Sequence, residues 1–168
     1  MKKLVLVVVL VAIIGTGAAF ADHPNGWGFG VQGGGSLGWI GFDFGGGGAL
    51  SLKAPTLPIF WGIEFGWSLW SGIRLGLTAD WYFLDLAIAS NILHFYMGVG
   101  GGLGVYFPFD LELVARVPIG LSLQIPIKSG IDTLELLYFH VVPSAGVAFI
   151  PIRFAGGLGF EAGIRLWF

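Results

Sequence analysis

The stretch that decides the fold is Arg153–Phe168, which reads RFAGGLGFEAGIRLWF. Every second residue from Phe154 onward is apolar, with Gly156 as the only gap. The other face of the pattern holds the three charged residues of the stretch, together with small residues and one tryptophan. A period of two indicates a β-strand whose two faces meet different surroundings. The stretch also exceeds the about 9–11 residues that a membrane-crossing strand needs.

The start of the chain predicts export. Two lysines precede the apolar run 4–14, and an A-x-A site that ends at Ala21 follows. A charged start, a short apolar run and this site together form a secretory signal peptide, and the run is too short to be a membrane-spanning helix. We therefore expect Sec-dependent export and cleavage between Ala21 and Asp22. This divides the chain into a signal peptide, 1–21, and one mature domain, 22–168.

The composition excludes several classes of protein. The chain is 55% hydrophobic and only 11% charged, with 30 glycines, no cysteine and a net charge of −2. A soluble domain needs about 25–35% charged residues on its surface, and a nucleic-acid-binding domain needs a basic patch. Beyond the signal peptide no apolar run reaches the about 20 residues of a membrane helix. A membrane protein without such helices must be a closed β-barrel, because closure pairs every backbone polar group.

Alternating segments predict an all-β, closed, antiparallel, eight-stranded transmembrane barrel with short loops. The expected strands are 26–37, 42–52, 59–69, 73–83, 93–107, 111–125, 136–149 and 153–168. Pro55 and Pro58 favour a turn between the second and third strands; one long bulged strand over 49–67 is the alternative. Pro118 falls inside the sixth strand, where a bulge would accommodate it.

One face of these strands carries nearly all the polar side chains. Its expected network consists of Glu64, Arg74, Asp80, Glu112, Arg116, His140, Glu161 and Arg165. If the apolar faces pointed inward, as in a secreted ligand-binding barrel, the surface would be mostly glycine and poorly soluble. We therefore expect the apolar faces in lipid and the network inside. Eight strands leave an interior just filled by side chains, so the sequence predicts a plugged barrel with no open channel.

Four stretches carry a resemblance to known proteins: LSLKAPTLPIFWGIEFG, VARVPIGLSLQ, VVPSAGVAF and GGLGFEAGIRLWF. The chain resembles small eight-stranded outer-membrane proteins of the OmpX and OmpW kind, and more closely uncharacterised spirochaete outer-membrane barrel proteins. The resemblance implies location in the outer membrane and delivery by periplasmic chaperones to the barrel assembly machinery. It also implies that a terminal aromatic strand is the assembly signal, here Phe160, Ile164, Leu166 and Phe168. The short loops differ from the OmpX pattern and argue against an adhesin.

Patterns that could carry chemistry fit the barrel better than a site. Glycine spacings such as Gly28-x-Gly30-x-x-Gly33 match a dinucleotide motif, but no helix follows them. His140, Ser144 and Glu161 offer the residue types of a hydrolase triad, yet residues four apart on a strand lie about 13 Å apart. No histidine cluster has the spacing of a metal site. We expect no enzyme activity, no cofactor and no metal.

The function expected from the sequence is a structural or interaction role in the outer membrane, as a monomer that contacts outer-membrane lipid and no nucleic acid. The alternatives are a narrow pore or carrier for small solutes, as in OmpW-like proteins, and a secreted soluble ligand-binding barrel. Tryptophans near strand ends are expected to form interfacial girdles: Trp27, Trp39, Trp61, Trp70, Trp81 and Trp167. Gly163, on the lumen face, is expected to tolerate alanine better than Ile164 tolerates arginine.

Overall fold

The computed structural model describes residues 24, 26–39, 43–89, 92–107, 110–127 and 130–168. The predicted signal peptide and its cleavage position lie outside these residues and stay predictions. All regular structure in the described part is β-strand: β1 (Gly28–Gly38), β2 (Phe44–Lys53), β3 (Ile59–Ser68), β4 (Gly72–Ala89), β5 (Leu93–Phe107), β6 (Asp110–Arg116), β7 (Ile119–Pro126), β8 (Thr133–Phe149), β9 (Ile152–Ala155) and β10 (Gly157–Trp167). A search of the described residues for helices able to cross a membrane finds none.

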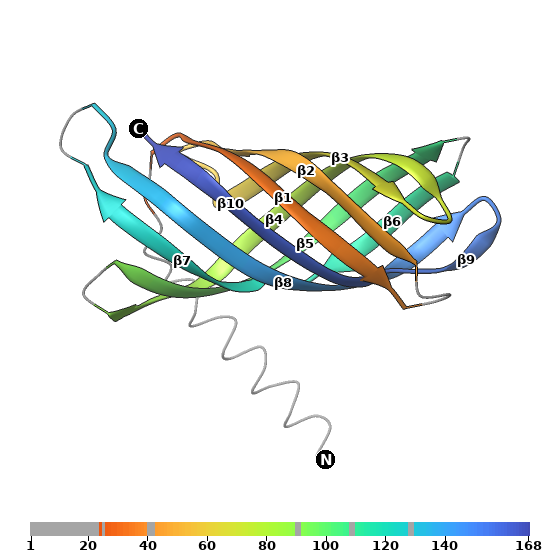
Figure 1. The fold of residues 1–168 in the computed structure, drawn as a ribbon. Coiled ribbons are helices and arrows are strands. Elements are labelled where there is room, and N and C mark those ends of the chain that lie inside the picture. Colours follow the sequence, from red (N-terminus) through yellow and green to blue (C-terminus); the bar gives the residue numbers. More distant parts are fainter. Residues whose placement is uncertain (1–23, 25, 40–42, 90–91, 108–109, 128–129) are drawn as a thin grey trace, which may run out of the picture.

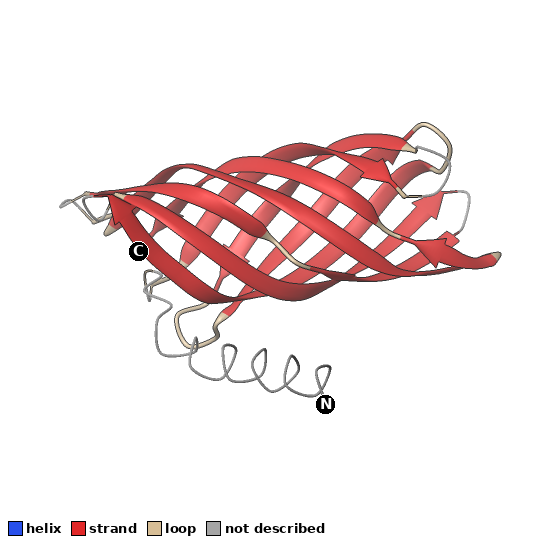
Figure 2. Ribbon diagram, turned by 90° about the horizontal axis from the view of Figure 1, so that it is seen from below, coloured by secondary structure: helices blue, strands red, loops and turns tan. Residues whose placement is uncertain are grey.

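The strands form one antiparallel sheet that closes on itself (Figures 1 and 2). Each strand from β1 to β5 pairs with the next along the chain, and β10 pairs with both β1 and β8. β6 and β7 occupy one position between β5 and β8, and β9 and β10 both lie beside β8. The result is a ring of eight strand positions, which confirms the predicted antiparallel eight-stranded order.

Both interruptions in the ring have a local cause. Pro118 has no backbone N–H and lies fully buried between β6 and β7, where a regular ladder would require a donor. The break is bridged by hydrogen bonds from Val117 N to Pro143 O, 3.0 Å, and from Gly98 N to Pro118 O, 2.9 Å. Between β9 and β10, Gly156 has φ +117°. The predicted sixth and eighth strands are therefore each two segments.

The uncertain boundary after β2 is a turn. β2 ends at Lys53 and β3 begins at Ile59, with Pro55 and Pro58 between them. β2 and β3 then pair with each other, Lys53 opposite Phe60. The alternative of one long strand over 49–67 is wrong, because the two segments run antiparallel.

Two register shifts move the inward face by one residue. In β4 the pairing with β5 shifts between Tyr82 and Leu84, so that Tyr82 and Asp85 are both buried. In β8 Leu136 and Leu137 are both exposed, while the flanking Glu135 and Tyr138 are both buried. β4 also continues through Ala89, six residues beyond the predicted end at residue 83.

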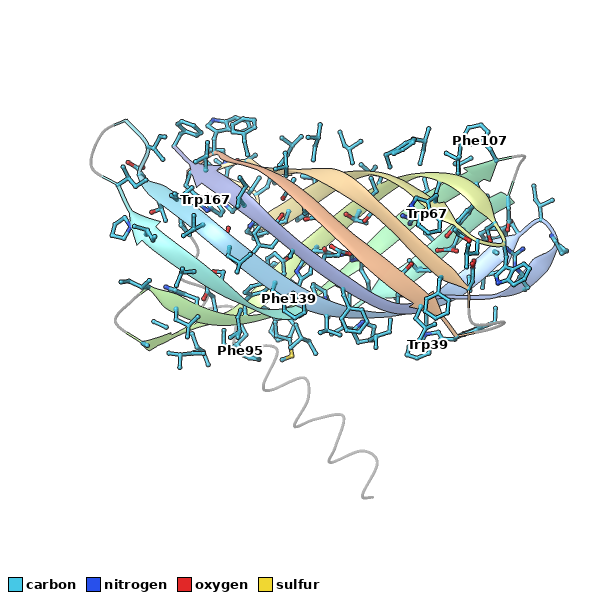
Figure 3. The ribbon with its side chains drawn as sticks, in the orientation of Figure 1. Trp39, Trp67, Phe95, Phe107, Phe139 and Trp167 are labelled. Atoms are coloured by element: carbon cyan, nitrogen blue, oxygen red, sulfur yellow. The ribbon has the colours of Figure 1, made fainter. Side chains whose placement is uncertain are left out.

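Large apolar side chains radiate from the outside of the ring, as Phe107, Phe139 and Trp67 do in Figure 3. Every charged residue on a described strand instead belongs to the inward face. The prediction that Trp167 belongs to an interfacial girdle is wrong, because its side chain lies inside the ring and is 0% exposed. Its position on the charged face of the closing strand, beside Arg165, places it there.

Glycine is required at some inward positions, because interior side chains and the neighbouring strand come close to the backbone there. A methyl group on Gly163 would approach the Tyr138 hydroxyl to 2.6 Å, a distance that side chains do not adopt. The backbone oxygen of Val31 would lie still closer, so alanine at Gly163 is not a mild change; the comparison with Ile164→Arg stays a prediction. Gly159, also inward on β10, would place its methyl 3.5 Å from Val142 Cβ, which is ordinary contact.

We predict that Gly156→Ala destabilises the ring more than Gly130→Ala does. Both glycines have positive φ, +117° and +76°, and alanine in a left-handed conformation costs about 1–2 kcal/mol. A methyl group at Gly130 would meet nothing within 4 Å, whereas at Gly156 it would lie 2.8 Å from Ala145 Cα. Denaturant unfolding in detergent measures both changes. Equal losses would show that crowding between β9 and β10 has no energetic effect.

Candidate functional site: a polar cavity above a filled interior

The described part of the interior contains a large cavity, at the end of the ring opposite Trp27 and Phe168. Its volume is about 580 Å³, within the about 300–1,000 Å³ of small-molecule sites. Turn residues Asp43 and Ser71 lie at its mouth, and Arg116 and Glu161 are at its floor. The cavity therefore extends partway along the ring from one end.

This cavity corrects the expectation of an interior filled along its whole length. The inward positions around it are largely glycine or serine: Ser36, Gly38, Gly45, Ser68, Ser144, Gly157 and Gly159. An eight-stranded ring is filled only when its inward residues have bulk. Glycine-rich segments of β1, β2 and β10 provide none here.

Arg116 is the centre of the cavity floor. Its Nη1 lies 3.1 Å from Glu64 Oε1, its Nε 3.1 Å from Asp80 Oδ1, and its Nη2 3.1 Å from Glu161 Oε1. Only 6% of the Arg116 side chain is exposed. Three carboxylates from β3, β4 and β10 thus surround one guanidinium from β6. A planar fork of five donors is suited to this role, whereas a lysine would offer a single point charge.

Further partners occupy the remaining oxygens of these carboxylates. Arg74 pairs with Glu64 Oε2. Glu161 Oε2 lies 2.7 Å from His140 Nε2 and accepts a hydrogen bond from Gln32 Nε2, also 2.7 Å. His140 Nδ1 in turn lies 3.1 Å from the Tyr96 hydroxyl. Buried polar groups are stable only when they are paired in this way.

The filled half of the interior begins below this network. Arg165 donates to Glu135 Oε2 and to Ser51 Oγ, both at 2.8 Å. Its guanidinium lies 4.5 Å from the Tyr138 ring centre and 4.7 Å from that of Phe60. The aromatic filling is completed by Tyr82, Tyr96 and Trp167. Cation–π contacts and apolar packing thus close the end of the ring where the chain ends.

The predicted polar residues therefore separate into groups. Six of them form one network centred on Arg116, in which Arg74 and His140 are linked through Glu64 and Glu161: Glu64, Arg74, Asp80, Arg116, His140 and Glu161. Arg165 lies in the filled half and pairs with Glu135 instead. Glu112 lies on the cavity wall, together with Tyr106 and Arg74.

Three buried charged residues escaped the sequence interpretation: Lys53, Asp85 and Glu135. Glu135 pairs with Arg165, and Asp85 Oδ1 lies 2.9 Å from His94 Nδ1. Strict alternation places these acidic residues on the apolar face, because it cannot anticipate the register shifts beside them. The available signal was the charge itself, since a carboxylate on an otherwise apolar face indicates a bulge.

Among the described residues that line the cavity, Ser144 does not lie beside a base. Ser144 Oγ accepts from Gly157 N at 3.0 Å and donates to Gly157 O at 3.3 Å, while His140 is engaged with Glu161 and Tyr96. A triad requires a serine within about 2.6–3.2 Å of its base. Nor do the described residues contain a group of three or more side chains able to hold a metal ion.

Comparisons with known proteins add little. No family model matches the chain, and no curated protein matches it. A solved structure described as "De novo design of transmembrane beta-barrels" is similar over 86% of this chain and 97% of its own, with 14% identity and a TM-score of 0.42.

We predict that Glu161→Gln destabilises the protein by about 3–5 kcal/mol, the cost of leaving one member of a buried ion pair without its partner. The amide would remove the charge that faces Arg116 and His140. Thermal and denaturant unfolding in detergent measure the loss. Asp132→Asn, in an exposed turn, is the matched control and should change stability little. A fully stable Glu161→Gln protein would contradict a structural role for this network.

Proposed function

We propose that the chain is an integral outer-membrane β-barrel with a structural or interaction role, and with an aqueous cavity that does not pass through it. The observation that carries this proposal is the sidedness of charge. On the described strands all charged residues face inward, while large apolar side chains cover the outside. A charge facing lipid at mid-depth costs about 2–4 kcal/mol, so this pattern suits lipid.

Strand length supports the same proposal. β1 and β10 have 11 residues each, and β2 and β3 have 10, the length that a tilted strand needs to cross hydrocarbon. The secreted, soluble barrel is disfavoured, because it requires the apolar faces to point inward.

Export and assembly complete the proposal. The leader 1–21 would direct the chain through the Sec pathway, with periplasmic chaperones and the barrel assembly machinery as partners. Phe160 and Ile164, on the outer face of β10, and Phe168, directly after it, have 43–47% of their surface exposed. Leu166 shares the outer face of β10. An assembly signal read from outside the barrel would need this accessibility. An even number of strand positions puts the start of β1 and the end of β10 at one end of the ring. We assign this end to the periplasm, so that the cavity opens outward.

The second candidate is a narrow pore or carrier for small solutes, and the cavity is the observation that favours it. We favour the closed barrel, because Arg165 and its aromatic neighbours fill the periplasmic half. Nothing in the polar network resembles a reaction centre, so the proposal includes no enzyme activity, cofactor or nucleic acid, and a monomer suffices.

We predict that Ile164→Arg prevents membrane insertion. Ile164 lies on the outer face of the closing strand, where a guanidinium would meet lipid at a cost that depends on its depth. The fraction of heat-modifiable, membrane-inserted protein measures the effect, and Gly159→Ala, on the inward face of the same strand, is the control. If Ile164→Arg inserts as efficiently as the unchanged chain, this face does not meet lipid.

We also predict that the protein does not conduct ions in planar bilayers until its filling is reduced. The double change Phe60→Ala and Trp167→Ala removes two rings that contact each other at 5.9 Å and should produce steady conductance. Trp67→Ala, outside the ring, is the control and should remain silent. Conductance by the unchanged protein would favour the pore.

A further inference from the structure

One strand of the ring extends beyond its neighbour. β3 begins at Ile59, opposite Trp81 of β4, and β4 then continues to Ala89 with β5 as its partner. In the described part of the chain no strand pairs with this segment on the side that β3 occupies earlier. The β4–β5 hairpin projects past the end of the ring that carries the C-terminus (Figure 1). We define the β4 edge as Leu86–Ala89.

Two prolines account for the early start of β3. Pro55 and Pro58 lie in the turn that separates β2 from β3, and proline cannot donate to a sheet ladder. The β3 side of the turn therefore cannot extend along β4, and the sequence itself leaves the edge uncovered.

The side chains of the β4 edge are apolar and accessible. Leu86 is 46% exposed and Ile88 is 58% exposed, and Ala87 and Ala89 are also exposed. The four residues contain no charge and no proline, which are two of the features that protect edge strands. The pairing with β5 shifts between Ala87 and Ala89, so the regular part of the edge is Leu86–Ala87.

This combination suits neither lipid nor water. Backbone N–H and C=O groups without partners are not tolerated in hydrocarbon, and an apolar strand edge in water is a template for strand addition. Only another extended backbone can satisfy both the polar groups and the apolar side chains. We propose that the β4 edge binds an extended segment of a partner protein, which adds a strand to the sheet and places alternate apolar side chains beside Leu86 and Ile88.

A second copy of this chain is a poor occupant. Two identical edges that pair antiparallel are related by a two-fold axis perpendicular to the sheet. In a barrel wall that axis lies in the plane of the membrane, so the two copies would cross the membrane in opposite directions. This step rests on the proposed membrane function; the unpaired edge itself does not.

Amide hydrogen exchange on the full, refolded chain in detergent micelles tests the proposal. The probe is a synthetic heptapeptide, Thr-Val-Thr-Val-Thr-Val-Lys, and the control is the same peptide N-methylated throughout, which cannot donate. Amides of the β4 edge that do not face β5 should exchange rapidly alone. They should slow by about tenfold or more when the unmodified peptide is added.

A pair of protein variants gives a matched comparison. Leu86→Lys places on the edge the residue that commonly blocks strand addition and should abolish the slowing. Leu121→Lys introduces the same change on β7, where Leu121 has similar exposure, 43%, but pairs with both Phe95 and Phe139; it should keep the slowing.

Three results would overturn the proposal: no slowing by the unmodified peptide, equal slowing by the N-methylated peptide, or protection that rises with protein concentration while sedimentation reports a dimer. The last would assign the edge to a second copy. The peptide controls use the unchanged protein, so they decide the question even if a lysine variant fails to fold. The Ile164→Arg insertion experiment tests separately whether the outer face of the ring meets lipid.

Discussion

The pairing of β10 with β1 is the interaction on which the rest of the structure depends. It joins Gly28 to Trp167 and Gly38 to Gly157, so that the first and last strands of the chain have no free edge between them. Once the sheet is closed, each strand has one face toward the axis of the ring and one face away from it. Successive side chains therefore point alternately into the interior and to the outside. On the described strands, this closure is what gives the charged residues a common interior to share.

Closure also concentrates charge in a confined space, and Arg116 shows how the chain manages it. One guanidinium faces three carboxylates at 3.1 Å, and Arg74 and His140 occupy the outer oxygens of Glu64 and Glu161. Such a network contributes less to net stability than its number of bonds suggests, because burying each charge costs several kcal/mol. Its stronger effect is on arrangement: β3, β4, β6, β8 and β10 must all be in register for the bonds to form.

Most of the ring could be predicted from the sequence, because alternation fixes strand positions and sidedness where it is regular. Arg116 and Glu161 could be assigned to the inward face from the alternation of apolar and polar residues alone. This alternation is interrupted at Phe83 and Leu136, where the strand contains one extra residue. The extra residue turns Asp85 and Glu135 to the inward face. Alternation also could not show that Arg165 and Arg116 belong to separate groups, because this depends on their distance from each other along the axis of the ring. The cavity escaped prediction because alternation assigns a glycine to the inward face but does not show that its missing side chain leaves space there.

The division of the interior into a water-accessible half and a filled half has an electrical consequence. In the membrane arrangement proposed above, water in the cavity would carry the potential of one compartment down to the level of Arg116. A voltage between the two sides of the bilayer would then fall mainly across the filled half, over a shorter distance than the bilayer thickness. Lys53 and Arg165 lie in that half, with Glu135 as the counter-charge. A charge displaced across the full voltage changes its energy by about 2.3 kcal/mol per 100 mV, so small movements of these side chains would respond to voltage more strongly than equal movements in the cavity.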